Sequence, residues 1–230
     1  MDNMIMYEDT VLLVVHKPAG IATETAKIGQ ADLVSELKNY RKKKGEDTYI
    51  GIVHRLDQPV EGLLVFAKDT HTAKTLSDCL REGNLTKKYV ALIAGVPQTQ
   101  EGVLTDFLIK DGRTNLSKVV LADTPGAKKA SLQWKLLAHN DKVSLLEIEL
   151  FTGRHHQIRV QMAYAGFPLL GDLKYGSVQG KELSDAFSIR ETALLAYQLC
   201  FIHPIKQKKM EFLLNIDKFM KIFCYCSDRN

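Results

Sequence analysis

Residues 54–68 read HRLDQPVEGLLVFAK, which places one acidic side chain, Asp57, between a basic pair and an apolar run. The turn formers Pro59 and Gly62 separate that side chain from the apolar run, so the stretch predicts a loop that leads into a buried strand. A carboxylate is costly to hold without a partner, and Arg55 is close by in the sequence. The stretch therefore predicts a sheet that presents one positioned carboxylate at the end of a strand.

The rest of the chain predicts a succession of short strands with a few helices. Helices are expected over residues 31–44, from an N-cap at Asp69 to a stop at Gly83, and over a third segment described below. Strands are expected over residues 10–16, 49–53, 62–67, 87–95, 103–109, 119–121, 130–137 and 143–150. This order predicts an α+β fold with a largely antiparallel mixed sheet and flanking helices. No repeat, linker or low-complexity segment marks a boundary, so a single domain over residues 1–230 is expected.

Composition narrows the function classes. The 230 residues are 45% hydrophobic, which allows a sizeable core, and a net charge of +4 with a pI near 8.7 is compatible with a polyanionic partner. No run approaches the ~18 apolar residues of a membrane span, and no export signal opens the chain. Irregular spacing predicts reduced thiols in a cytoplasmic protein for the four cysteines, Cys79, Cys200, Cys224 and Cys226.

The basic run Arg41 to Lys44 ends the first predicted helix. Cations at a helix C-terminus are stabilised by the helix dipole, and this interpretation is preferred to a dedicated RNA contact, although the two are compatible.

A second informative segment, residues 151–166, reads FTGRHHQIRVQMAYAG. Its periodicity predicts a helix that begins near Arg154, with His155, His156 and Arg159 gathered at its N-terminus, where backbone N–H groups favour anions. An ordinary solvated helix face explains the same residues about equally well. A metal site is not expected, because adjacent histidines on a helix point in different directions and no other ligand has suitable spacing.

Taken together, these segments resemble the motifs of the RluA-type RNA pseudouridine synthases. The stretch at 54–68 is similar to that family's catalytic motif, and residues 153–160 are similar to its pattern Gly-Arg-x-His-Gln-Ile/Leu-Arg-Val. Residues 166–176 continue in the same way, with Gly-Asp-x-x-Tyr-Gly at their end. Shorter similarities lie at residues 14–20, 88–91 and 200–204, so the resemblance covers nearly the whole chain.

The resemblance implies a pseudouridine synthase catalytic domain without an N-terminal S4-like RNA-binding domain. In the family's terms Asp57 would be the catalytic residue, Tyr89 would stack on the target base, and Arg159 would pair with Asp57. The implied partner is ribosomal or transfer RNA, with no cofactor, no metal and no obligate protein partner, so a monomer is expected. The implied RNA- or substrate-binding residues are Lys17, His54, Arg55, Arg154, His156, Gln157 and Leu195.

The chain departs from the family's usual residues at four positions, Val60, Glu61, Gln161 and Ala196. None of these replaces Asp57, so they bear on the choice of substrate rather than on the reaction.

The implied chemistry needs few residue types. The N1–C1′ bond of uridine breaks, the uracil rotates, it rejoins through C5, and the C5 proton leaves. An ionised carboxylate can attack C1′ or take the C2′ proton, and these two roles stay open. A nearby guanidinium favours the ionised form, and a tyrosine ring can retain the detached uracil by stacking.

Two other function classes remain open at this stage. An RNA-binding protein of the same fold without turnover would not need Asp57. A hydrolase of N-glycosides would let water capture C1′, and such an enzyme usually needs a second carboxylate, for which Glu61 is the nearby candidate.

Overall fold

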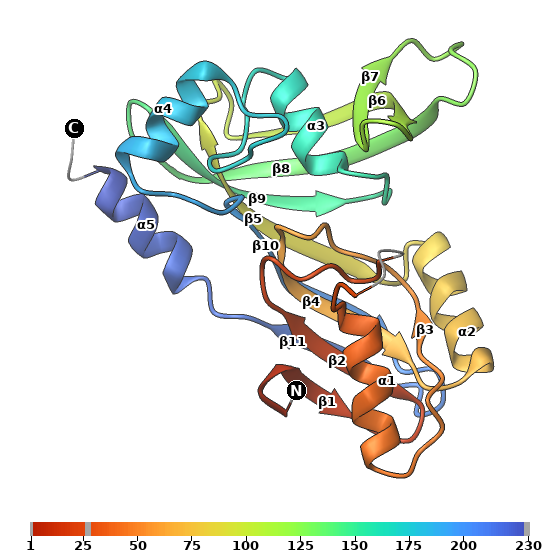
Figure 1. Cartoon of the computed structure of the whole chain (residues 1–230). Coiled ribbons are helices and arrows are strands. Elements are labelled where there is room, and N and C mark those ends of the chain that lie inside the picture. The colour runs from red at the N-terminus through yellow and green to blue at the C-terminus, as the bar shows by residue number, and fades with distance from the viewer. Residues whose placement is uncertain (1, 26–28, 228–230) are drawn as a thin grey trace. The chain divides into compact units, whose positions relative to one another are not determined.

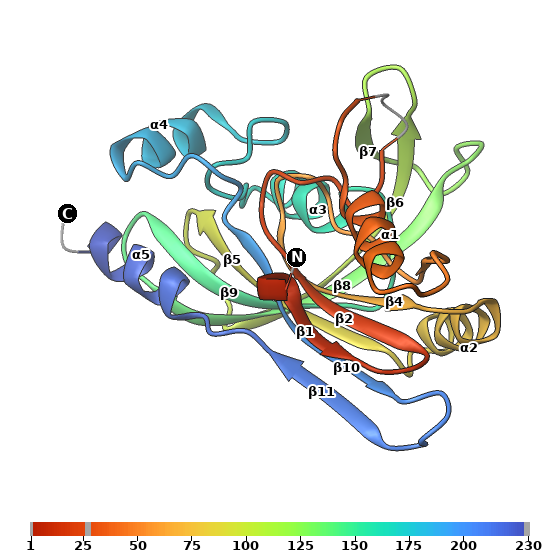
Figure 2. The same ribbon diagram turned by 60° about the horizontal axis from the view of Figure 1, so that its bottom comes forward.

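The computed structural model describes residues 2–25 and 29–227 and divides into two compact units. Unit 1 comprises Met1–Lys87 and Ala196–Leu214, and unit 2 comprises Lys88–Leu195 and Asn215–Asn230. Both units combine antiparallel strands with helices, as Figures 1 and 2 show, so the α+β class is confirmed. The single catalytic domain stays a prediction.

Unit 1 contains strands from both ends of the chain. β1, β2 and β4 are neighbours in that order, β3 pairs with β4, and β11 pairs with β10. The strands are β1 (Ile5–Glu8), β2 (Leu12–Lys17), β3 (Gly51–Ile52), β4 (Glu61–Ala67), β10 (Leu194–Ile202) and β11 (Lys209–Leu213). A 3-10 turn η1 (Asp2–Met4) precedes them, and the helices are α1 (Leu33–Lys43) and α2 (Thr70–Arg81).

The helices of unit 1 begin where capping residues predict. Asp32 accepts a hydrogen bond from the Ser35 backbone N at 2.7 Å, and Asp69 accepts one from the Thr72 N at 2.8 Å. Each cap satisfies a backbone N–H that the first turn of a helix leaves without an intrahelical partner. The apolar sides of β2, β4, β10 and α2 then share one core cluster, which explains why these short segments hold together.

The basic run at the end of α1 is mostly used within unit 1. Arg41 is 5% exposed, pairs with Glu46 at 3.3 Å and donates to the carbonyl of Lys68 at 3.1 Å. Lys44 pairs with Glu8 at 3.0 Å. These two side chains therefore serve the fold, and only Lys42 and Lys43 are left exposed without an ion pair among the described residues.

Unit 2 is built on an antiparallel sheet with the order β5-β9-β8-β6-β7. Its strands are β5 (Thr86–Ala94), β6 (Glu101–Asp111), β7 (Leu116–Val120), β8 (Lys128–His139) and β9 (Val143–Leu150), and its helices are α3 (Gln157–Tyr164), α4 (Val178–Ala186) and α5 (Asp217–Ser227). Figures 1 and 2 both show α3 beside the β6–β7 hairpin, where Val160 packs against Leu108 and Ala130. This small core fixes α3 on one face of the hairpin.

One helix boundary differs from the prediction. α3 begins at Gln157 rather than near Arg154, because His156 has a positive φ of 54° and lies in the left-handed region. His155 and His156 therefore precede the helix. The solvated-face interpretation is wrong, since all side chains from Gln157 to Met162 are buried. The expected stop at Gly166 is confirmed by a φ of +89°.

Across the residues that the structure describes, every helix is too short or too polar to cross a membrane.

Candidate active site

Asp57 lies half-buried in the loop between β3 and β4, and a second loop holds the residue on each side of it. On the N-terminal side, the Thr23 hydroxyl donates to the Leu56 carbonyl at 2.9 Å and accepts from the Leu56 N at 3.2 Å. This reciprocal pair fixes the peptide groups before Asp57. A single side chain thus replaces the backbone partner that a strand would have supplied.

On the C-terminal side, the carbonyl of Gln58 accepts from the Gly20 N at 2.9 Å and from Lys17 Nζ at 3.3 Å. The Gln58 side chain returns a hydrogen bond to the Gly20 carbonyl at 3.0 Å. Gly20 has a φ of +86°, a conformation that glycine adopts without strain. The two loops therefore hold Asp57 between two anchored neighbours.

Lys17 is a fully buried cation behind this loop. Besides Gln58, its Nζ donates to the carbonyls of Pro18 at 2.9 Å and Ile21 at 2.8 Å. Burial lowers its pKa to about 8, although the charges of Asp57 and Glu61 oppose that shift. Lys17 thus ties the loops together and provides positive charge near the carboxylate.

Two of the four departures, Glu61 and Ala196, lie at the start of β4 or against it. Glu61 contacts His16, whose Nε2 lies 2.9 Å from the acceptor oxygen Glu61 Oε1. Gly62 has a φ of +146°, and a Cβ there would lie 2.4 Å from the Cβ of Ala196. The motif glycine is therefore required by the close approach of β10, and the small Ala196 is part of that fit.

His54 and Arg55 have different surroundings. His54 is 8% exposed, accepts from the Val65 N at 3.3 Å, and has a pKa far below its usual value because burial and then the charge of Lys87 disfavour protonation. Arg55 is on the surface, with its Nη1 4.0 Å from Glu24. The RNA contact predicted for His54 would need access that burial restricts, whereas Arg55 has that access.

Arg159, on α3 in unit 2, makes a buried two-pronged ion pair with Asp172. Its Nε and Nη2 each donate to one carboxylate oxygen at 2.7 Å, and the side chains are 3% and 1% exposed. Burial alone would raise the pKa of Asp172, but Arg159 and the N–H groups of Lys174 and Tyr175 outweigh it and lower the pKa. Asp57 belongs to unit 1, so its pairing with Arg159 stays a prediction.

A polar network continues from Arg159 to the β6–β7 hairpin. The guanidinium lies 5.3 Å from the centre of the Tyr175 ring, and the Tyr175 hydroxyl meets His156 Nδ1 at 2.8 Å and accepts from the Ser117 N at 2.7 Å. His155 Nδ1 lies 2.9 Å from the Ser117 hydroxyl. These contacts fix the N-terminal end of α3 to the β6–β7 hairpin.

The expectation that His155 and His156 point in different directions is wrong. Their rings stack with centroids 3.7 Å apart, because the left-handed backbone at His156 turns its side chain back over its neighbour.

Gln157 organises the turn before α3. Its Oε1 accepts from the Thr152 hydroxyl at 2.7 Å and from the Arg154 N at 2.9 Å, and its Nε2 donates to the Ser131 carbonyl at 3.0 Å. Arg154 is exposed, and its Nε donates to the Lys129 carbonyl at 2.8 Å. Gln157 therefore has a structural task, and Arg154 is the more accessible of the two.

Tyr89 lies on β5, where it is 4% exposed and opposite Ile148 on β9. Leu195 is the second residue of β10 and is 3% exposed. Their substrate contacts, like those of the other binding residues, stay predictions. Neither the residue pattern nor the family resemblance predicted a role for Asp172 or Tyr175, although both lie in the Gly-Asp-x-x-Tyr-Gly motif.

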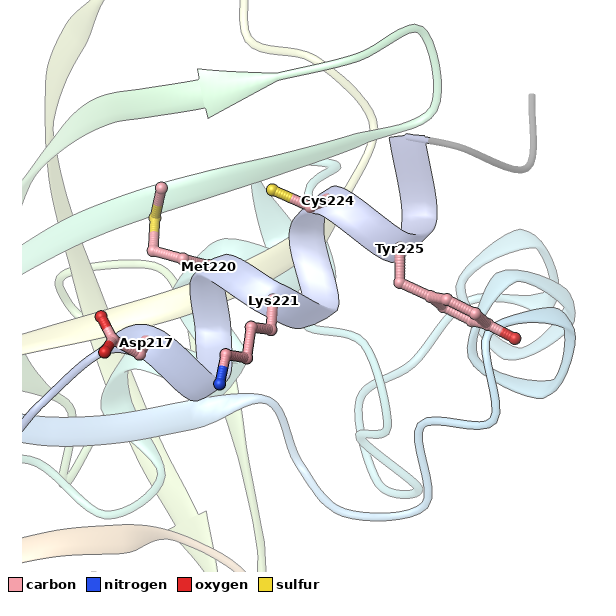
Figure 3. A pocket seen from close by; sticks show the side chains of 5 residues that line it. All are labelled: Asp217, Met220, Lys221, Cys224 and Tyr225. Atoms are coloured by element: carbon pink, nitrogen blue, oxygen red, sulfur yellow. The ribbon is translucent and has the colours of Figure 1, made fainter.

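Among the described residues, no three His, Cys, Asp or Glu side chains are grouped as metal ligands. A cavity of about 380 Å³ is lined by residues of α5 and contains none of the predicted site residues (Figure 3). The lining residues are Asp217, Met220, Lys221, Cys224 and Tyr225.

Comparison with known proteins gives consistent matches. Residues 11–164 match the family model described as RNA pseudouridylate synthase. An uncharacterized RNA pseudouridine synthase, YhcT, of Bacillus subtilis is 36% identical over 204 residues, which are 87% of this chain and 64% of that protein. The ribosomal large subunit pseudouridine synthase C of Buchnera aphidicola subsp. Baizongia pistaciae is 31% identical over 222 residues, 96% of this chain and 69% of that one. The chain thus spans about two thirds of the length of these relatives.

A solved structure supports the fold. The human RNA pseudouridylate synthase domain containing 4 superposes with a TM-score of 0.77 at 24% identity, covering 99% of this chain and 93% of that one.

Proposed function

Because the chain belongs to the RNA pseudouridylate synthase family, we propose that it isomerises uridine in RNA to pseudouridine, with Asp57 as its catalytic carboxylate. The observation that carries this proposal is the double clamp on the Asp57 loop. Thr23 holds the residue before Asp57, and Gly20 with Lys17 holds the residue after it. A carboxylate that must meet C1′ or the C2′ proton of one nucleotide needs this kind of fixed backbone.

Large-subunit ribosomal RNA is the proposed substrate. Relatives that share most of this chain are named ribosomal large subunit pseudouridine synthase C and D, at 31% and 33% identity. A uridine within a helix is inaccessible to Asp57, so the target must be flipped out or already unpaired. That step costs a few kcal/mol, which phosphate contacts would offset.

In this proposal each site residue has one task. Asp57 forms the bond to C1′ or removes the C2′ proton, and Lys17 holds its loop. Tyr89 retains the detached uracil by stacking, and the positive charge of the Arg159 guanidinium keeps the carboxylate ionised. Asp172 accepts from two of the five guanidinium N–H groups of Arg159, which holds the guanidinium in a fixed orientation.

The test is product analysis with Asp57→Asn and a matched control, Glu61→Gln. Each change removes one carboxylate charge, from the loop at Asp57 or from the start of β4 at Glu61, and Glu61 contacts His16. Purified protein is incubated with large-subunit ribosomal RNA transcribed in vitro, and nucleosides are separated after digestion. We expect pseudouridine, of unchanged mass, from the wild type and from Glu61→Gln, and none from Asp57→Asn.

Each other product has a definite meaning. Free uracil would indicate an N-glycoside hydrolase, and loss of uracil release in Glu61→Gln would identify the second carboxylate of such an enzyme. RNA binding with no product from any variant would indicate a binding protein. Activity of Asp57→Asn within tenfold of the wild type would remove Asp57 from the chemistry.

A further inference from the structure

In unit 2, the β6–β7 hairpin and the neighbouring strand β8 carry exposed cations on the face against which α3 packs. Lys110 lies opposite Ser117, which is buried and contacts His155. Lys128 lies opposite Leu108, which packs with Val160 of α3. Because directly opposed residues in an antiparallel sheet share a face, both lysines belong to the α3 face.

Two more cations reach the same place from other segments. Lys174 donates from its Nζ to the carbonyl of Asn115, at the tip of the hairpin, at 3.2 Å. Arg154 directly precedes His155 and is held by the Lys129 carbonyl. We define the hairpin surface as the exposed side chains Lys110, Lys128, Arg154 and Lys174.

Cations of the hairpin surface have no acidic partner within the described part of the chain. In unit 1, Lys44, Lys68 and Lys206 are each paired with a carboxylate, whereas Lys42 and Lys43 have no ion pair among the described residues. Lysines left unpaired together are unfavourable through mutual repulsion, and a polyanion relieves that repulsion. The hairpin surface therefore has charge available for an external partner.

The position of these cations relative to Arg159 selects one partner. The network through Ser117 and Tyr175 links the α3 face of the hairpin to the Arg159 guanidinium. An RNA whose target nucleotide reaches Arg159 can continue across this face. Lys110 and Lys128 are diagonal neighbours, at a separation of roughly 7–8 Å, so they can contact different phosphates of one strand.

We propose that the hairpin surface binds RNA phosphates outside the target nucleotide, and that it does so on the α3 face only. The inference rests on the proposed function, since RNA is its partner. It adds the surface that supplies affinity beyond the catalytic residues.

The opposite face of the sheet formed by β8, β6 and β7 provides a matched control. Lys118 and Lys129 lie opposite Ile109 and Phe107 on β6, so they alternate with Lys110 and Lys128 and point to the other face. The double variant Lys110→Glu/Lys128→Glu changes the net charge as much as Lys118→Glu/Lys129→Glu. Lys110 and Lys118 lie on the paired strands β6 and β7, and Lys128 and Lys129 both lie on β8. Non-specific attraction would be weakened equally by both pairs.

The experiment measures binding of large-subunit ribosomal RNA transcript over a range of KCl concentrations. We expect the α3-face pair to weaken binding at least tenfold and to reduce the slope of log K against log salt by roughly 1.5, for two lost phosphate contacts. The opposite-face pair should weaken binding less than threefold. Equal losses in both pairs, a larger loss in the opposite-face pair, or no loss in either would overturn the inference.

Folding and function are separated by two further measurements. Lys110→Gln/Lys128→Gln removes the two positive charges without adding acidic side chains. If a Glu variant unfolds, this Gln pair replaces it, and its loss of RNA affinity must still exceed the loss caused by the same change at the opposite-face pair. Pseudouridine formation by the wild type is assayed on the same transcript. If the wild type makes no pseudouridine, the proposed function fails, whereas the difference between the two faces still decides the binding surface.

Discussion

Removal of Asp172 tests whether the structure identifies the main buried partner of Arg159. Asp172 accepts hydrogen bonds from Arg159 Nε and Nη2, both at 2.7 Å, and from the backbone N atoms of Lys174 at 2.9 Å and Tyr175 at 3.2 Å. Asp172→Ala would leave a buried guanidinium without this partner and two backbone groups without an acceptor. We expect a large loss of stability from a single side chain of modest size.

The magnitude follows from burial. Both side chains of the pair are almost fully buried, at 3% and 1% exposed, and breaking such a pair by removing one partner costs roughly 3–5 kcal/mol. Asp172→Asn keeps one acceptor oxygen in place, so a smaller loss of roughly 1–3 kcal/mol is expected.

The stability that the Arg159–Asp172 pair contributes should depend on pH in a defined direction. The pKa of Asp172 is lower in the folded protein than in the unfolded chain, because Arg159 and the backbone donors outweigh the effect of burial. The pair therefore contributes its full stability above the unfolded pKa of about 3.9, and loses it as pH falls through the folded value. The difference between wild type and Asp172→Asn should be constant near neutral pH and should narrow below about pH 4.

Urea unfolding monitored by tryptophan fluorescence is the assay. Trp134, the single tryptophan, lies on β8 in unit 2 and is 8% exposed, so it reports the unit that contains Asp172. Asp185→Ala is the control, because Asp185 pairs with Arg190 at 3.3 Å in an exposed site where side chains are 76% and 58% exposed. That change should cost no more than about 1 kcal/mol. A loss in Asp172→Ala no greater than in the control would refute the reasoning.

Three further outcomes are expected. Arg159→Lys should lower the single-turnover rate by roughly tenfold, and Arg159→Ala should lower it by more than 100-fold. Only Arg159→Ala should shift the acid limb of the pH–rate profile to higher pH. If both variants keep the wild-type rate, Arg159 lies outside the site. Lys87→Met should raise the free energy of unfolding at pH 7 by up to roughly 3 kcal/mol, because burial lowers the pKa of Lys87 to about 8. The wild type should gain stability between pH 8 and the unfolded value of 10.5, and this gain should be smaller in the variant when urea unfolding is followed across that range. Gly62→Ala should destabilise the protein by roughly 2–4 kcal/mol in thermal or urea unfolding, because the added Cβ meets Ala196; a neutral result would contradict the close approach of β10.

Local signals predicted the elements well, because capping and periodicity act within a few residues. Asp69 predicts the start of α2, and the structure shows its carboxylate on the Thr72 N–H. The apolar runs predict β2, β4 and the strands of unit 2 within a few residues of their bounds. Only two residues of the expected strand over 49–53 are paired, as β3, because pairing depends on a neighbour that the segment itself does not contain.

Partners across the chain could not be read from local patterns. Arg159 pairs with the carboxylate of Asp172, 13 residues away. Asp172 lies in the Gly-Asp-x-x-Tyr-Gly motif, but neither the motif nor its spacing predicts this pair. α3 begins at Gln157, later than the predicted start near Arg154, because His156 adopts a left-handed backbone conformation. Contacts of His156 with Tyr175 and with the stacked ring of His155 support that conformation. Such a conformation is favourable only when tertiary contacts compensate for it.

The sequence by itself therefore determined the class of fold, the strands and helices between residues 10 and 166, the family, and the choice of Asp57 as the candidate carboxylate, because these depend on short-range patterns and ordered motifs. It did not predict β1, α4, β10, β11 or α5. Only the tertiary structure decided that Lys17 is buried behind the Asp57 loop, that Arg159 is paired with Asp172, and that Lys110 and Lys128 share the α3 face of the hairpin. Burial, ion pairing and the face of a sheet are properties of segments that meet in space, and they follow from the packing of the whole chain.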